Sequence, residues 1–177
     1  IRLHEKLTGR VFDPLIEVVL LQFCKPHGIK VQGQTFLQAA DWNTPTTVRN
    51  AAHEMLHPPV PMDGAAAQAA LAVLAKDPLI PRVVADHDPK WGYTTLEGLL
   101  NEDIAQALDQ LISEALGVAR NPADRWRKAD DGIHVLAGGI YGMLRHDRWI
   151  ETGGSIEVWL AGAVRAGRFD PGRLHAV

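Results

Sequence analysis

The sequence has 177 residues, of which 46% are hydrophobic and 22% are charged, and its formal net charge at pH 7 is −3. This composition is typical of one folded domain and excludes a disordered chain, while the dispersed basic residues argue against a nucleic-acid-binding or anionic-membrane surface. No apolar run reaches the ~18 residues of a membrane span, so we expect a single domain over residues 1–177 that does not cross a membrane.

The chain contains one cysteine, Cys24, and begins at Ile1. A single cysteine excludes an internal disulfide and a cysteine-based zinc site, which leaves histidines and carboxylates as metal ligands. Because the first residue is not Met, we expect a fragment or a processed form of a longer protein. The sequence does not determine the compartment; we expect a soluble protein and favour the cytoplasm.

The first predicted elements are a helix and a strand. Residues 11–24 are predicted to form a buried helix, since Asp13 can cap it and Pro14 fits its first position, although the β-branched residues also fit a strand. Polar and apolar residues then alternate over 29–38, which predicts a half-exposed strand with Gly33 as a bulge. We expect this strand to be the edge of a small sheet.

The next predicted element is a helix over residues 45–57. Thr44 is a natural N-cap, and Pro45 fits the first helical position. Pro58 disfavours helical geometry in the residue before it, so the helix is expected to end directly at residue 57.

This helix carries the pattern H-E-x-x-H at His53, Glu54 and His57. Residues four apart lie on one face of a helix, so the two imidazoles can bind a single ion. Neutral imidazoles suit Zn²⁺, and a carboxylate beside a zinc-bound water can remove a proton from it. The pattern therefore predicts a zinc site with Glu54 as general base.

The chain after the motif is predicted to be mostly helical. The clearest helix covers residues 95–116, where apolar residues recur along one face. We therefore expect an α+β fold that is mostly helical. The other predicted helices cover residues 65–75, a short stretch near Pro81, and residues 122–128, 132–145 and 156–166.

A catalytic zinc ion usually has three protein ligands, so a third group is needed beside the two histidines. The candidates are Asp63, Glu97 and Glu102. Asp63 lies six residues after His57, where the pattern H-E-x-x-H-x-x-G-x-x-H/D has its third ligand. That pattern needs a glycine at position 60 to turn the chain back to the metal, and this chain has Val60 there. Glu97 also fits a capping box, in which it bonds the Thr94 amide.

A strand, a helix with H-E-x-x-H and a later helix with a Glu resemble the zincin metallopeptidases, specifically the gluzincin or thermolysin-like arrangement. The resemblance covers roughly residues 29–116. It implies a zincin-like fold and a third zinc ligand supplied by a Glu on the downstream helix. The stretch Asn101-Glu102-Asp103-Ile104-Ala105-Gln106 favours Glu102, and the pair Glu97-Gly98 keeps Glu97 as the alternative.

The resemblance also implies a zinc-dependent peptidase acting on a peptide or protein substrate. Glu54 would be the general base, and strand 29–38 would align an extended peptide along its edge. A second group is expected to stabilise the oxyanion. The candidates are His134, Tyr141 and Arg145, which are spaced by seven and four and can share one face of a predicted helix.

Two other functions fit the same residues. The chain can be a zincin-fold protein with a conditional or non-peptidase role, such as hydrolysis of a non-peptide amide. It can also be a helical interaction module in which the motif is fortuitous, because its alanine-rich and glycine-rich helices can pack on a partner. A partner protein or a homo-oligomer is compatible with each of these functions.

Overall fold

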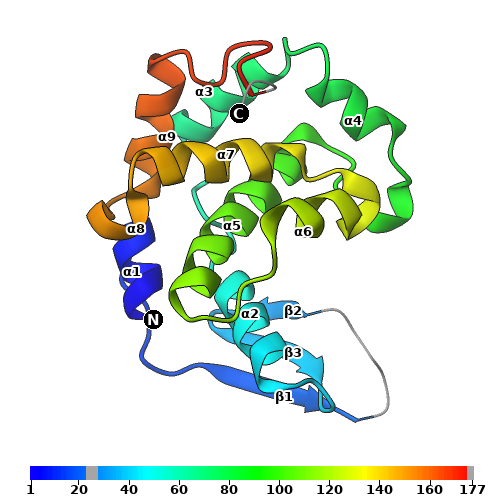
Figure 1. The fold of residues 1–177 in the computed structure, drawn as a ribbon, viewed down its shortest axis with the longest axis vertical. Helices are drawn as coiled ribbons and strands as arrows, with labels where there is room; N and C mark the ends of the chain where they lie inside the picture. The colour runs from blue at the N-terminus through cyan, green and yellow to red at the C-terminus, as the bar shows by residue number, and fades with distance from the viewer. Residues whose placement is uncertain (23–27, 175–177) are drawn as a thin grey trace.

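The computed structural model describes residues 1–22 and 28–174, so Cys24 and the end of the predicted 11–24 helix lie outside the described residues. The fold is α+β, mostly helical with a small three-stranded sheet at one end of the molecule (Figure 1). No helix in the described ranges has the length and apolar character needed to cross a bilayer. The helices are α1 Arg2–Thr8, α2 Thr44–Glu54, α3 Ala65–Leu74, α4 Ile80–Asp86, α5 Leu96–Ala115, α6 Pro122–Lys128, α7 Val135–His146, α8 Trp149–Thr152 and α9 Ile156–Arg165. A 3-10 helix covers Pro89–Trp91, and a kinked turn with positive φ at Asp130 and Asp131 covers Ala129–Gly132.

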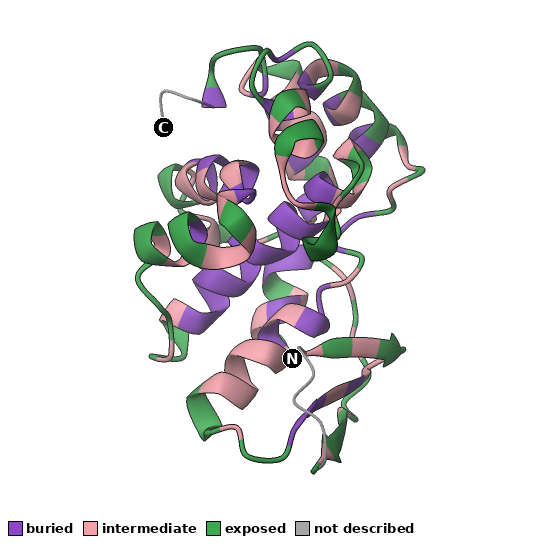
Figure 2. Ribbon diagram, turned by 90° about the vertical axis from the view of Figure 1, so that its right-hand side faces the viewer, coloured by how far each residue is buried: buried purple, intermediate pink, exposed green. Residues whose placement is uncertain are grey.

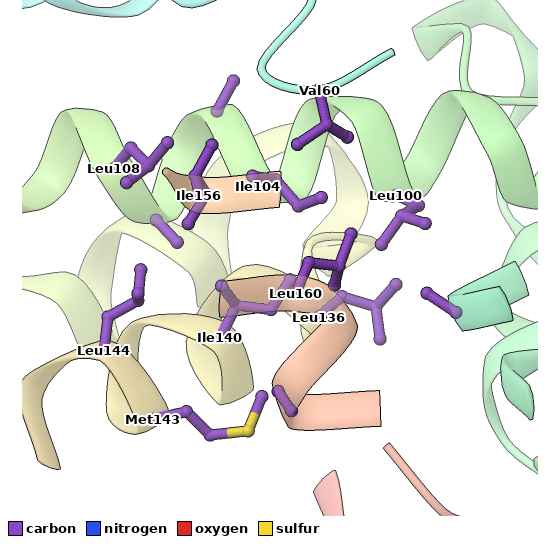
Figure 3. Close-up of a cluster of buried hydrophobic side chains, with 14 of the residues drawn as sticks. Val60, Leu100, Ile104, Leu108, Leu136, Ile140, Met143, Leu144, Ile156 and Leu160 are labelled. Carbon is purple, nitrogen blue, oxygen red and sulfur yellow. The ribbon is translucent and has the colours of Figure 1, made fainter. Parts of the chain in front are cut away.

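Helix α5 runs through the centre of the helical region and is buried along most of its length (Figure 2). One of its faces is apolar, because Leu100, Ile104 and Leu108 recur at intervals of one turn. These side chains pack with Ile140 of α7 and Leu160 of α9 in the main core (Figure 3). The apolar periodicity of the sequence thus identified the central helix correctly.

A second face of α5 is buried and polar. Helix α2 packs on α5 and also contacts strand β3, so α2 lies between the sheet and the central helix (Figure 1). Buried polar groups are costly unless they are paired, so neighbouring elements must supply their partners. The buried polar residues of α5 are Glu102, Asp103, Gln106, Asp109, Gln110 and Ser113.

The sheet consists of β1 (Glu17–Leu21), β2 (Ile29–Gln32) and β3 (Thr35–Ala39), in the order β1-β3-β2. The predicted buried helix over 11–24 is wrong, because residues 17–21 form β1, which pairs with β3 in parallel. A continuous apolar run has no polar spacing that separates a helix from a strand. Its β-branched residues suit the strand, and most of β1 is exposed rather than buried.

The predicted strand over 29–38 is two antiparallel strands joined by a turn at Gly33. Gly33 has φ +53°, a backbone conformation that glycine adopts at little cost, and the turn reverses the chain. Strand β3 directly precedes α2 and is the central strand, so the expectation of an edge strand before the motif helix is wrong. The two edge strands of the sheet are β1 and β2.

The helices predicted after the motif are present, with small shifts at their ends. The sequence patterns missed α1 and α8, which are too short to show a clear period. Helix α2 is capped by Asn43, whose Oδ1 accepts a hydrogen bond from the Thr46 amide at 2.9 Å, and not by Thr44. It ends at Glu54, three residues before the predicted end.

Helix α1 is anchored on α2 by the buried side chain of His4. Its Nε2–H donates to the carbonyl oxygen of Ala52 at 2.9 Å. This carbonyl is available because the Leu56 amide bonds to the carbonyl of His53 at 2.9 Å and not to that of Ala52. Burial lowers the pKa of His4 from 6.5 to about 4, so the folded protein keeps this imidazole neutral at pH 7.

We expect His4 to make the protein sensitive to mild acid. In the unfolded chain the imidazole takes up a proton below pH 6.5, whereas in the folded protein it does so only near pH 4. Stability is therefore present above pH 6.5 and is lost as the pH falls toward 4. Between pH 7 and pH 5 the loss is about 2 kcal/mol.

Urea unfolding at the two pH values measures this loss. His4→Gln retains an N–H donor for Ala52 and does not titrate. Between pH 7 and pH 5 the free energy of unfolding of this variant should therefore fall by about 2 kcal/mol less than that of the wild type. His146→Gln, a change at an exposed histidine of α7, should behave like the wild type. An equal loss in all three proteins contradicts the assignment.

Candidate metal centre

The packing of α2 on α5 brings His53, His57 and Glu102 together. The Nε2 atoms of the two histidines lie 3.0 Å apart. Glu102 Oε1 is 3.3 Å from the Nε2 of His53, and its Oε2 is 3.3 Å from the Nε2 of His57. Ligand atoms of all three residues lie within 4.8 Å of one another, so this cluster can hold a metal ion.

The second histidine reaches the cluster although it lies outside α2. After Glu54 the chain continues in tighter turns, in which the Leu56 amide bonds to the carbonyl of His53 and the His57 amide bonds to the carbonyl of Glu54. These hydrogen bonds link residues three apart, whereas those of an α-helix link residues four apart. The turn nevertheless keeps both imidazoles on one side of the chain.

The carbonyl groups after α2 are held by two basic side chains from the beginning of the sequence. Arg10 donates to the carbonyl of Pro58 at 2.6 Å and to that of Leu56 at 3.2 Å. Lys30, on β2, donates to the carbonyl of His57. The last carbonyls of a helix lack internal partners, and basic side chains bond them favourably. The position of His57 therefore depends on Arg10 and Lys30.

His53 is oriented by a buried carboxylate on the side away from the cluster. Its Nδ1–H donates to Asp109 Oδ2 at 2.7 Å, and Arg125 holds Asp109 through contacts of 2.5 and 2.8 Å. This bond places a proton on Nδ1 and directs Nε2 toward Glu102. Asp109 was not singled out from the sequence, although it follows Glu102 by seven residues, which puts both on one helix face.

Glu102 is oriented in the same way. Its Oε1 accepts a hydrogen bond from Gln106 at 3.0 Å, one turn further along α5. The amide oxygen of Gln106 in turn accepts from the indole N–H of Trp126 at 2.9 Å. Helix α6 therefore fixes the carboxylate through one intervening side chain.

Charge pairing dominates the protonation of the cluster. Burial alone would lower the pKa of His53, but the Glu102 and Asp109 carboxylates raise it well above its usual range. Burial would likewise raise the pKa of Glu102, but the His53 and His57 imidazoles lower it well below its usual range. A metal ion held by His53 would have to displace this imidazole proton, so the cluster is expected to bind a metal more tightly as the pH rises.

A cavity of about 470 Å³ opens beside the cluster and is lined by His53, Glu54 and Tyr93, among others. Glu54 is only 7% exposed and therefore has little contact with bulk water. The Tyr93 hydroxyl interacts with Glu102, and burial followed by the Glu102 charge raises the pKa of this phenol. Tyr93 has φ +54°, a strained backbone conformation of the kind that clusters at functional sites. Nothing in the sequence pattern indicated this tyrosine.

His134, a predicted catalytic residue, lies behind Tyr93. Its Nδ1 bonds to Asp103 at 2.7 Å and its Nε2 bonds to Asp130 at 2.9 Å. Its ring contacts that of Tyr93 edge-on, with 5.3 Å between the centroids. Burial opposes its charged form, but the two carboxylates raise the pKa of His134 to about 9. His134 is not among the described residues that line the cavity.

Tyr141 and Arg145, the other candidates for oxyanion stabilisation, are not brought to the cluster. The Tyr141 hydroxyl donates to Glu114 at 2.6 Å, and Arg145 donates to that hydroxyl at 3.0 Å. Glu114 lies on α5 about 18 Å along the helix axis from Glu102. His134 precedes α7 as its N-cap residue, so the three candidates do not share one helix face as expected.

The alternative third ligands lie away from the two histidines. Glu97 is exposed in the first turn of α5, and Asp63 is exposed between α2 and α3. The expected capping box is wrong, because the helix is capped by Thr95, whose hydroxyl accepts from the Gly98 amide at 3.0 Å. Among the three carboxylates considered, the structure brings only Glu102 to the histidines.

Comparisons with known proteins do not identify a family for this chain. No protein-family description matches the sequence, and no match was found among curated proteins or among solved structures. The function is therefore argued from the geometry of the cluster and the cavity.

We expect metal binding to depend on Glu102 and not on Glu97. Glu102→Gln should weaken the binding of Co²⁺, followed by its visible absorbance, by more than about 100-fold, since loss of an outer partner alone costs about 10–100-fold. Glu97→Gln changes an exposed carboxylate of the same helix and should leave the affinity unchanged. The opposite pattern would assign the third ligand to Glu97.

Proposed function

We propose that this chain is a zinc-dependent peptidase, with His53, His57 and Glu102 as the zinc ligands. The observation that carries the proposal is the convergence of two imidazole nitrogens and one carboxylate beside a cavity that also contains Glu54. Two His and one Glu form a ligand set used by catalytic zinc sites, which keep a fourth position for water or substrate.

The spacing of the three groups suits zinc. Zinc lies about 2.0–2.2 Å from nitrogen and oxygen ligands, so two ligands of a tetrahedral site are about 3.3–3.6 Å apart. The distances between His53, His57 and Glu102 are 3.0, 3.3 and 3.3 Å. The carboxylates and amides around them provide the outer hydrogen bonds that orient zinc ligands.

Glu54 is the proposed general base. When bound, a zinc ion lowers the pKa of a coordinated water to about 7 and polarises the substrate carbonyl. Glu54 lies next to His53 in the chain and lines the same cavity, so its carboxylate can take up the proton of the attacking water. It then gives this proton to the leaving amine, which restores the carboxylate for the next cycle.

Tyr93 is proposed to stabilise the oxyanion in place of Tyr141. Its phenol remains protonated at neutral pH and lines the cavity next to the proposed ligand Glu102. An O–H group can donate to the substrate carbonyl oxygen as negative charge develops on it. His134, held by Asp103 and Asp130, contacts the Tyr93 ring and is a positioning residue for it.

Strand β2 offers a place for an extended peptide. It forms one edge of the sheet, its Lys30 bonds the carbonyl of His57, and Gly28, which directly precedes the strand, lines the cavity. Ile29 and Val31 are about half exposed, at 48% and 55%. A peptide that pairs with this edge gains main-chain hydrogen bonds and contacts with apolar side chains.

Glu54→Gln should abolish hydrolysis and leave zinc bound. The amide cannot take up a proton, so cleavage of a peptide library should fall by about 10²–10⁴-fold. Zinc content, measured by atomic emission, should remain at one ion per chain because Glu54 is not a ligand. Glu151→Gln, a change at an exposed carboxylate of α8, is the control and should alter neither quantity. Bound zinc with undiminished hydrolysis in Glu54→Gln contradicts the assigned role.

The two tyrosines of the chain give a matched pair of variants. Tyr93→Phe removes the hydroxyl in the cavity and should lower kcat by about 10²–10³-fold with little change in KM, since the hydrogen bond strengthens only in the transition state. Tyr141→Phe removes a hydroxyl bonded to Glu114 and should leave kcat unchanged. A large loss of kcat in Tyr141→Phe alone would return the role to Tyr141.

A further inference from the structure

The cavity beside the metal cluster is lined by three carboxylates, Glu54, Asp109 and Asp130, and by a larger number of lysine and arginine side chains. Four basic side chains line it. Two of them have carboxylate partners, because Arg125 bonds to Asp109 at 2.5 Å and Lys90 bonds to Asp88 at 2.5 Å. The other two are Arg49 and Arg120, which form no ion pair with a carboxylate of the described residues.

Arg49 is held in place but keeps unused donors. Its Nη1 donates to the carbonyl of Val118 at 2.9 Å, and its Nη2 donates to the hydroxyl of Thr46 at 3.0 Å. Both acceptors are neutral, and its buried Nε–H has no partner in the described part of the protein. A guanidinium has five N–H donors in a fixed planar arrangement, which suits an incoming carboxylate.

Arg120 adds a second positive charge to the cavity, close enough to act on Arg49. It is exposed at the connection between α5 and α6. Burial, followed by the charges of Arg120 and Arg125, lowers the pKa of Arg49. Like charges in one cavity repel each other, so an anion placed between Arg49 and Arg120 would relieve this repulsion.

We propose that Arg49 and Arg120 bind a carboxylate group of the substrate. This inference rests on the proposed peptidase function and names its substrate class, peptides with a carboxylate close to the scissile bond. Arg49 precedes His53 by one turn of α2, an axial rise of about 6 Å. An extended peptide covers about 3.3–3.6 Å per residue, so the carboxylate belongs to a residue within about two positions of the cleaved bond.

Binding to the zinc-loaded full chain with Glu54→Gln tests the proposal without turnover. The first pair of probes is an N-acetylated tripeptide with a free C-terminal carboxylate and its C-terminal amide. The second pair consists of amidated peptides that contain either Glu or Gln. In calorimetry, the acid of one pair should bind roughly 10- to 100-fold more tightly than its neutral counterpart. A difference in the first pair identifies a C-terminal carboxylate, and a difference in the second pair identifies a side-chain carboxylate.

The arginine variants then show whether these side chains cause the preference. Arg49→Gln and Arg120→Gln should each reduce the ratio of the two affinities, acid over neutral peptide, toward one. Arg120 is exposed, so it can be changed with little risk to folding. Arg127→Gln, an exposed arginine of α6 that does not line the cavity, should retain the preference. Equal binding of acids and amides, or a preference that survives in the double variant Arg49→Gln/Arg120→Gln, overturns the proposal.

Hydrolysis by the chain that retains Glu54 separates this inference from the proposed function. Peptide cleavage with no preference for a carboxylate overturns the inference and leaves the peptidase proposal intact. Arginine-dependent carboxylate binding without cleavage of any peptide supports the subsite and overturns the peptidase proposal.

Discussion

The feature on which the rest of the structure depends is the contact between α2 and the polar face of α5. A central helix that buries Glu102, Asp103 and Asp109 is stable only if neighbouring elements neutralise these carboxylates. His53 and Arg125 neutralise the first and the last, and His134 neutralises Asp103. The ion pairs of Glu102 with His53 and His57 offset the cost of burying this carboxylate, and they also form the cluster of possible metal ligands. Stability and the proposed chemistry are therefore coupled at this interface.

The early end of α2 is the second determinant of the site. In a regular helix through His57 the Leu56 amide would bond the carbonyl of Ala52, which would then be shared with His4. The tighter turn instead leaves carbonyl groups that His4, Arg10 and Lys30 bond from three separate parts of the N-terminal region. Arg10 and Lys30, which precede the motif in the sequence, thus hold the backbone on both sides of His57 and fix the position of its imidazole. This arrangement explains how a small sheet and a short helix take part in building the site.

The opposite wall of the cavity is built from irregular chain, and its conformation is held by contacts with α5 and α7. Tyr93 lies in a strained conformation between a 3-10 helix and α5. Asp130 also has a positive φ, at +45°, and bonds His134, which contacts the Tyr93 ring. Strained residues persist where the surroundings over-determine them. Buried ion pairs in this wall provide that constraint and place a phenol in the cavity next to Glu102.

The sequence by itself determined the elements whose signals are local. The spacing of His53 and His57, the apolar period of α5 and the proline and glycine boundaries predicted the paired imidazoles and most helices. Tertiary structure decided what depends on residues far apart in the chain: the approach of Glu102 rather than Glu97 to the two histidines, the hydrogen bond of Asp109 to His53, and the distance of Tyr141 from this cluster. It also decided that residues 17–21 form a strand, since pairing with β3 selects between two local conformations that the apolar run allows equally. Periodicity records which face of an element is buried, whereas the partner on that face is set by how the elements pack.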